Sequence, residues 1–183
     1  EPALARLSGA KVKNIGVIVN RAGGALLAKK GTSRDPKKWH GKRIITPRPP
    51  HTSVSLMQLI LINNGYDKAD NDGLVWKPKG GADKDAVRFT PVLAGSEFAA
   101  LAADQADLSF VLEPNIAIGV AQGFEEVTSF AKEFGDFFYT SFAVTEESIN
   151  KHGEQVQKFV NAMQKAMLFG HKHPDKAAEV AVK

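Results

Sequence analysis

Short runs of β-branched and apolar residues alternate along the chain with segments whose apolar residues have helical spacing. The runs predict strands at 12–19, 25–28, 43–46, 87–92, 107–112, 127–130 and 138–144. The helical segments are 2–7, 54–62, 97–103, 114–122 and 154–169, and further helices begin at Glu146 and Pro174. Ser96 is expected to cap the helix at 97–103, and Thr145 the helix that begins at Glu146. In the segment 154–169 the apolar residues recur at i, i+3, i+4 and i+7, which predicts a stripe in the core. Because strands and helices alternate, the sequence predicts an α/β fold with largely parallel strands.

The segment 41–65 predicts a strand, a proline-bearing loop and a buried helix. Pro47, Pro49 and Pro50 exclude both a helix and a central strand between the other two parts. Thr52 or Ser53 is expected to cap the helix, which is apolar on nearly every side and ends at 63–65.

The start of this helix carries no acidic residue, since no Glu or Gln follows the cap at the position of a capping box. Its free N–H groups and the positive end of its dipole are therefore open to an anion, with Arg48 and His51 beside them. Two interpretations stay open. The segment could bind a ligand, or it could be an ordinary capped helix whose N–H groups face water.

A polar segment at 66–85 mixes Lys and Asp with glycine and predicts an irregular insert. It contains Asp70-Asn71-Asp72-Gly73, which is similar to part of a calcium-binding loop. Lys68 and Lys79 occupy the positions where that loop needs carboxylates, so we reject a calcium site.

The composition is that of an ordinary globular protein: 183 residues, 43% apolar and 24% charged, enough for one or two small domains. The chain has no cysteine, which excludes disulfides, thiolate metal sites and cysteine nucleophiles. No apolar run reaches the roughly 18 residues that span a bilayer. The first residues, EPALARLSG, lack the pattern of a signal segment, which fits a cytosolic protein or an exported one that has been processed.

The net charge of +4 is unevenly distributed, since residues 1–50 carry +10 and the remainder carries −6. A basic segment can indicate nucleic acid, an anionic membrane surface or an anionic small ligand. The basic residues here are scattered, and only Trp39 supplies an aromatic ring near them. We therefore expect no nucleic-acid partner.

Four stretches in this order resemble the type 2 periplasmic binding proteins of ABC importers, in the branch that binds sulfonates, taurine, nitrate and thiamine pyrimidines. The stretches are NRAGGALLAKKG, GKRIITPRPPHTSVSLMQLILINNGYD, VLAGSEFAALAADQADLSFVLEPNIAIGVAQG and FVNAMQKAMLFGHKHPDKAAEVA. Together they cover most of the chain. None of them is a signature by itself, so the resemblance depends on their combined order.

The resemblance implies two α/β lobes with mainly parallel sheets, joined by crossover strands, with the ligand in the cleft between them. Residues 37–135 would form the second lobe, and 1–36 and 136–183 would form parts of the first. The first lobe would be incomplete, because the family has a strand–helix–strand unit before the position of Glu1 and further helices at its end. The implied partners are a small-molecule ligand and an ABC permease and ATPase. The implied location is periplasmic or extracytoplasmic, with membrane contact only through the transporter or a lipid anchor outside this chain.

The candidate ligand-binding residues lie mainly at three junctions where a predicted helix follows a predicted strand, 50–53, 95–96 and 113–115. Ligands of such sheets bind beyond the carboxyl ends of the strands. Thr52, Ser53 and Ser96 supply hydroxyls and helix-start N–H groups that suit a carboxylate, sulfonate or phosphate-like group. Glu113 could pair with an amine or a positive ring on the ligand, or could favour its own helix N-terminus. The complete set is Arg21, Arg48, His51, Thr52, Ser53, Gly95, Ser96, Glu113, Asn115 and Tyr139.

Two further assignments, those of Arg21 and Arg48, have a structural alternative. Arg21 and Arg48 could add charge-assisted hydrogen bonds or could be solvated at the surface. Tyr139, with Phe137 and Phe138, approaches the return crossover that the resemblance implies, where an aromatic wall would serve a ligand. Core packing is the alternative for the two phenylalanines.

These residues predict a binding protein for a small anionic or zwitterionic organic solute of the sulfonate, nitrate, carboxylate or pyrimidine type. We expect no enzyme, no cofactor and no metal, because the sequence contains no G-x-S-x-G elbow, no P-loop and no metal-spaced His, Asp and Glu set. Two alternatives stay open. They are an enzyme of the same fold, similar to the thiamine-pyrimidine synthases, and the ligand-sensing effector domain of a transcription regulator.

Overall fold

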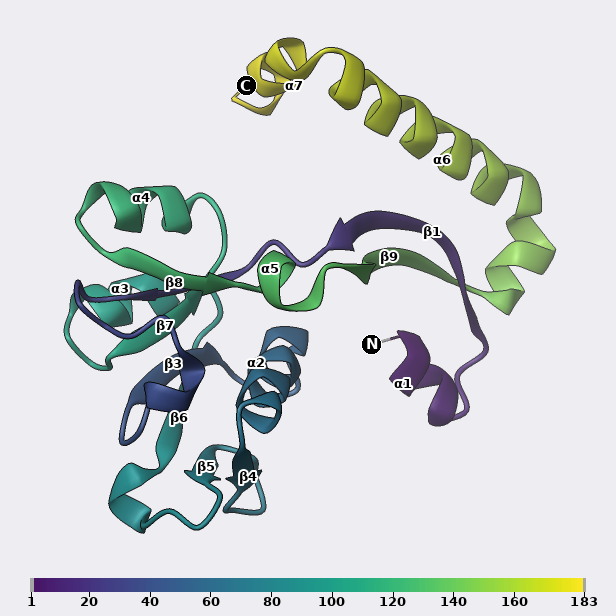
Figure 1. The fold of residues 1–183 in the computed structure, drawn as a ribbon. Helices are drawn as coiled ribbons and strands as arrows, with labels where there is room; N and C mark the ends of the chain where they lie inside the picture. Colours follow the sequence, from purple (N-terminus) through teal and green to yellow (C-terminus); the bar gives the residue numbers. More distant parts are fainter. Residues whose placement is uncertain (1, 183) are drawn as a thin grey trace. The chain divides into compact units, whose positions relative to one another are not determined.

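The computed structural model describes residues 2–182 and divides the chain into two compact units. The larger unit is Arg21–Phe137, and the smaller one combines Glu1–Asn20 with Phe138–Lys183. Both boundaries fall within long strands, β1 (Val12–Arg21) and β9 (Asp136–Thr145), which are labelled in Figure 1.

The larger unit is built on a seven-stranded mixed sheet with the order β4-β5-β6-β3-β7-β2-β8. Its central strand β3 runs parallel to both neighbours, so that Ile45 lies opposite Thr90 of β6 and Ser109 of β7. In contrast, β2 is antiparallel to β7 and β8, and β5 is antiparallel to β4 and β6. The strands are β2 (Ala25–Ala28), β3 (Arg43–Pro47), β4 (Tyr66–Lys68), β5 (Val75–Pro78), β6 (Val87–Val92), β7 (Leu108–Val111) and β8 (Glu125–Ser129).

The predicted α/β fold is confirmed. The prediction of largely parallel strands was wrong, because only the pairs β3–β6 and β3–β7 are parallel among the described pairs of this sheet, and the pairs of β2 and of β5 are antiparallel. The hairpin of β4 and β5 was not predicted, because its segment is mostly polar. Two aromatic residues hold it to the unit, since Tyr66 and Trp76 are buried. The Tyr66 hydroxyl donates to the Pro36 carbonyl, and the Trp76 indole donates to the Gly73 carbonyl.

Helices follow the parallel strands and cover the sheet. The apolar side chains of α3 and α4 form one core cluster with β2 and β3, in which Leu27, Ile45 and Leu101 are fully buried. The helix α2 packs on β3 and β4 and buries Met57 and Ile60. The helices are α2 (Thr52–Asn63), α3 (Glu97–Ala102), α4 (Asn115–Ala121) and α5 (Phe130–Phe134), with 3-10 turns at Pro36–Lys38 and Asp83–Asp85.

The division of the chain differs from the expected one at its first boundary, which was expected after residue 36 and lies after Asn20, whereas the second lies within two residues of the expected position. Residues 25–28 form β2, which lies between β7 and β8 in the sheet of the larger unit. All four of its side chains are buried. An apolar strand of this kind needs neighbours on both edges and cover on both faces, so the segment after Asn20 belongs with the larger unit.

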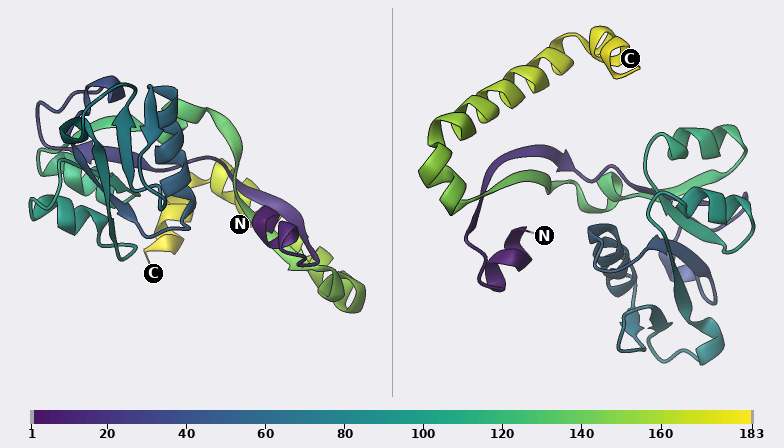
Figure 2. Two further views of the ribbon diagram at one scale, coloured as in Figure 1. Left: turned by 90° about the horizontal axis from the view of Figure 1, so that it is seen from below. Right: turned by 180° about the vertical axis from the view of Figure 1, so that it is seen from behind.

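The smaller unit contains the two-stranded sheet of β1 and β9 and three helices, α1 (Pro2–Leu7), α6 (Glu146–Lys172) and α7 (Pro174–Ala181). In both views of Figure 2 the two strands run side by side. Thr145 caps α6 as predicted, because its hydroxyl accepts from the Ser148 N–H at 3.1 Å. The helix expected to begin at 154 is continuous with this one, although His152 has non-helical backbone angles.

The apolar stripe of α6 was predicted to lie in a core, and the structure gives it only partial cover. Phe142 and Phe159 pack edge to face with ring centroids 4.8 Å apart. Val160, Met163 and Met167 line an apolar hollow of about 270 Å³ together with Ile15 and Val17 of β1. Neither α6 nor α7 contains a buried side chain in the described part of the chain. Two strands cannot cover a helix of this length. No helix of the described residues is long and apolar enough to cross a membrane.

Asp107 aligns the starts of β3 and β7. Its carboxylate accepts from the Arg43 N–H at 2.8 Å and from the Lys42 ammonium at 3.0 Å, and its own N–H donates to the Arg43 carbonyl. Desolvation is the largest single influence and acts to raise the pKa of Asp107. The hydrogen bonds from Arg43 and Lys42 and their charges outweigh it, so the pKa is lowered overall.

We expect Asp107→Asn to reduce the free energy of unfolding near neutral pH by about 1–2 kcal/mol, since charge-assisted hydrogen bonds are lost. A lowered pKa stabilises the fold above the unfolded-state value of about 4, and this stabilisation is lost as the pH falls through the folded-state value. The difference between Asp107→Asn and the natural protein should therefore shrink on going to about pH 3. Chemical denaturation at both pH values measures it, with the exposed Asp72→Asn as control. An undiminished difference in acid would contradict the assignment.

Candidate functional site

Three helix starts lie at one edge of the central sheet. Because β3, β6 and β7 are parallel, their carboxyl ends point to the same edge. The chain enters α2 after β3, α3 after β6 and α4 after β7. The three predicted junctions, at 50–53, 95–96 and 113–115, are these connections.

A cavity of about 230 Å³ lies among these connections, entirely within the larger unit. It is smaller than the roughly 300–1,000 Å³ pockets that hold drug-sized ligands, so it suits a small solute. Four of the predicted site residues line it, namely His51, Gly95, Glu113 and Asn115. The complete lining is Pro47, His51, Ala94, Gly95, Glu97, Phe110, Leu112, Glu113 and Asn115.

His51 is both a wall of the cavity and the N-cap of α2. The expected caps were Thr52 or Ser53, and this prediction was wrong. The Nδ1 atom of His51 accepts from the Ser53 N–H at 3.3 Å and lies 2.6 Å from the Ser53 hydroxyl. The buried Ser53 hydroxyl is thereby committed to His51, and Thr52 is exposed outside the lining.

Glu97 is the side chain of the second junction that faces the cavity, and sequence reasoning missed it. Ser96 was expected to cap α3, but its hydroxyl donates to the Leu93 carbonyl at 2.6 Å and makes no capping bond. Glu97 instead accepts from the Gly95 N–H at 2.7 Å through Oε2, and only 7% of the residue is exposed. A glutamate in a first helical turn is typical of a favourable dipole interaction, so the sequence offered no separate signal for a cavity.

Glu113 and Asn115 line the cavity from the third junction. Oε2 of Glu113 accepts from the Ala117 N–H at 3.2 Å, so the side chain supports the start of α4. The same residue also lines the cavity. The two roles considered for Glu113 are therefore compatible.

The apolar wall of the cavity includes Phe110, whose ring packs against Phe130 and the backbone of Gly24. Its ring stacks on Phe130 with centroids 5.2 Å apart and planes inclined by 22°. The backbone of Gly24 passes so close that a Cβ there would lie 2.1 Å from the ring atom Cε2. Gly24 is needed at this position because any side chain would displace Phe110.

The remaining predicted residues do not line this cavity. Arg48 is exposed, and Arg21 is paired with Asp136 at 2.6 Å. The hydrogen bond and charge of Asp136 raise the pKa of Arg21. Tyr139 belongs to the smaller unit, and burial raises its pKa. The core interpretation was wrong for Phe138, which is 81% exposed.

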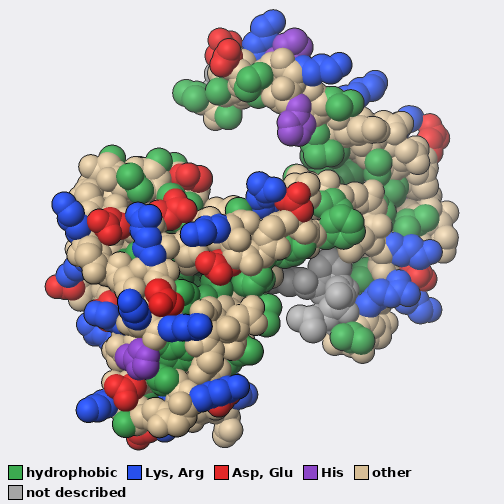
Figure 3. Space-filling model, in the orientation of Figure 1, with side chains coloured by type: hydrophobic (Ala, Val, Ile, Leu, Met, Phe, Trp, Pro, Cys, Tyr) green, Lys and Arg blue, Asp and Glu red, His purple; other side chains and the backbone are tan. Residues whose placement is uncertain are grey.

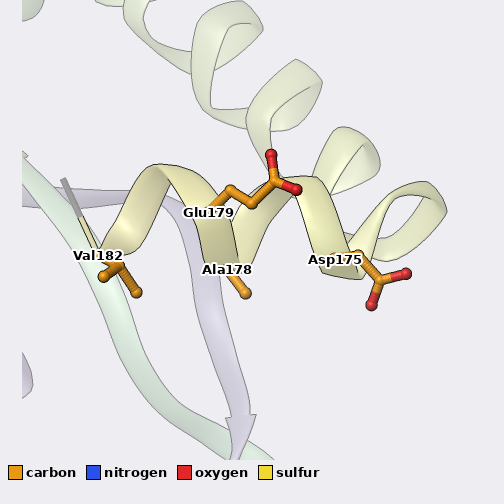
Figure 4. A pocket seen from close by; sticks show the side chains of 4 residues that line it. All are labelled: Asp175, Ala178, Glu179 and Val182. Atoms are coloured by element: carbon orange, nitrogen blue, oxygen red, sulfur yellow. The ribbon is translucent and has the colours of Figure 1, made fainter.

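Two other features of the described residues do not form a comparable site. A wide hollow is lined by Asp175, Ala178 and Glu179 of α7 and by Val182 directly after it (Figure 4). On the face of the larger unit that Figure 3 shows, Lys and Arg side chains are interspersed with Asp and Glu. Within residues 2–182, no group of three His, Asp or Glu side chains could hold a metal ion.

Comparison with solved structures identifies the fold as that of type 2 periplasmic substrate-binding proteins. The aliphatic sulphonate-binding protein SsuA of Escherichia coli matches with a TM-score of 0.69 and 14% identity over 96% of this chain and 55% of its own. The alkanesulfonate-binding SsuA of Xanthomonas axonopodis pv. citri, bound to MOPS, matches with a TM-score of 0.67 and 18% identity. This match covers 98% of this chain and 56% of that protein. The desulfurization enzyme DSZB matches with a TM-score of 0.61 and 13% identity over 97% of this chain and 62% of its own. The chain thus spans about half the length of the two SsuA proteins.

A comparison of the sequence with protein-family models identifies the family. The family described as "NMT1/THI5 like" matches residues 73–177, which is more than half of the chain. The chain belongs to the NMT1/THI5-like family. No curated protein sequence matches it significantly.

We expect Gly24→Ala to push the Phe110 ring toward the cavity and to reduce the free energy of unfolding by about 1–3 kcal/mol, because an overpacked core forces side chains and backbone to move. Gly23→Ala is the matched control, since nothing lies within 4 Å of the position of its Cβ. Chemical denaturation of both variants makes the comparison. Equal free energies of unfolding for Gly24→Ala and Gly23→Ala would show that Phe110 does not depend on a glycine at position 24.

Proposed function

We propose that this chain is the solute-binding part of an ABC-type importer and that it captures a small organic solute in the cavity of the larger unit. The observation that carries the proposal is the convergence of three strand–helix connections on that cavity. Its lining combines apolar surface from Pro47, Phe110 and Leu112 with polar groups from His51 and Asn115. A few placed polar groups in an apolar wall are typical of small-molecule sites.

The structural relatives support this role through their own functions. Two are sulfonate-binding proteins, and a third is the ligand-binding component of an ABC-type import system from Staphylococcus aureus, at 12% identity and a TM-score of 0.66. By this analogy the partners are an ABC permease and its ATPase, and the location is periplasmic or extracytoplasmic. The candidate ligands are anionic or zwitterionic solutes of the sulfonate, nitrate, carboxylate or pyrimidine type.

An enzyme is the second candidate, because DSZB shares the fold. The absence of cysteine excludes a thiol nucleophile anywhere in the sequence. We favour binding over catalysis because each polar group of the cavity has a structural partner that holds it in place. His51 caps α2, Glu97 binds Gly95 and Glu113 binds Ala117. Recovery of a bound solute unchanged after long incubation, measured by mass spectrometry, separates the two candidates.

The test is a thermal-shift screen of sulfonates, carboxylates, nitrate, pyrimidines and amines on the full gene product. A ligand at 100 times its Kd adds about 2.7 kcal/mol of stability, which raises Tm by several degrees. We expect Asn115→Phe, which fills the cavity, to weaken binding of a hit at least about tenfold, a loss of about 1.4 kcal/mol.

Ala117→Phe is the matched control, because Ala117 is exposed on the same helix and does not line the cavity. It should bind a hit as the natural protein does. The proposal is wrong if no compound raises Tm, or if Asn115→Phe binds a hit with unchanged affinity.

A further inference from the structure

The charged side chains that line the cavity are all acidic. Glu97 and Glu113 face it, whereas no Lys or Arg is among the lining residues. Some carboxylates elsewhere in the larger unit are paired with a lysine, as Asp107 is with Lys42 and Asp83 with Lys77. The cavity holds two carboxylates with no such cation among its lining residues.

Each of these carboxylates has an oxygen that the protein leaves unused. The hydrogen bonds of Glu97 and Glu113 to backbone N–H groups use Oε2. Among residues 2–182, Oε1 of neither residue has a hydrogen-bond partner, and no Lys or Arg lies within 4.0 Å of either carboxylate. Glu97 is 7% exposed, so little water surrounds its carboxylate and a nearby cation would stabilise it.

His51 is held on the wall of the cavity by Ser53. Its Nδ1 accepts from the Ser53 N–H at 3.3 Å and lies 2.6 Å from the Ser53 hydroxyl. The other polar side chain of the lining, the Asn115 amide, carries no charge.

We propose that the cavity binds a protonated amine of a small organic solute, with the ammonium group between Glu97 and Glu113. This inference rests on the proposed function and narrows its ligand. An ammonium group has three donors, enough to engage both Oε1 atoms. Leu112 and Phe110 contact the carbon skeleton beyond it. The carboxylate-free start of α2 favoured an anionic ligand. The structure places Glu97 beside that start, so a solute with an anion alone would meet two like charges.

The experiment compares pairs of probes that differ only in the amine. The pairs are 2-aminoethanesulfonate with ethanesulfonate, and 4-aminobutanoate with butanoate. Isothermal titration calorimetry near neutral pH on the full gene product measures each Kd. We expect the amine-bearing member of at least one pair to bind at least tenfold more tightly than its partner. Glu97→Gln and Glu113→Gln should each weaken that binding about tenfold and leave the amine-free member unchanged or tighter.

The controls keep the outcomes separate. Glutamine at 97 retains an oxygen for the Gly95 N–H, and Glu113 is exposed, so that at least the second variant folds. Glu126→Gln, on an exposed strand position outside the lining, should bind every probe as before. Equal or tighter binding of the amine-free members overturns this inference alone. If neither pair of probes binds and no compound of the thermal-shift screen raises Tm, both the inference and the proposed function are wrong.

Discussion

The parallel pairing of β3 with both β6 and β7 is the constraint on which the rest of the larger unit depends. Parallel strands must leave the sheet at a common edge, so three connections and three helix starts are brought to one place. The starts of β3 and β7 are held in line by Asp107, whose carboxylate binds the Arg43 N–H and the Lys42 ammonium. The cavity is a consequence of this pairing, since its lining comes from the carboxyl-end residues of β3 and β7 and from the connections and helix starts that follow the three strands.

The cavity combines a rigid apolar wall with carboxylates that have no internal counter-charge. Phe110 is fixed between Phe130 and the backbone of Gly24, so the wall keeps its shape without a ligand. Glu97 is held by the Gly95 N–H and Glu113 by the Ala117 N–H. Backbone donors of this kind orient a carboxylate and leave its charge in place, which suits recognition of a ligand more than bond-making.

Most strand and helix positions could be predicted because each depends on local pattern, and the three junctions followed from the alternation of these elements. The hairpin of β4 and β5 could not, because its segment is mostly polar. The side chains that face the cavity depend on tertiary contacts. Glu97 has the sequence signal of any glutamate in a first helical turn, yet its burial comes from the neighbouring strands. His51 replaces Thr52 and Ser53 as the cap because an imidazole can also accept a backbone N–H. Arg21 has its partner 115 positions away, a distance over which local pattern carries no information.

The most direct test of the central claim, that this cavity is the ligand site, is a ligand titration followed by ¹H–¹⁵N NMR on the full gene product. The account predicts that the amide signals of Ser53, Gly95 and Ala117 shift together with one Kd, because their N–H groups bind the side chains that line the cavity. Shifts confined to another region, such as the hollow along α7, would contradict it.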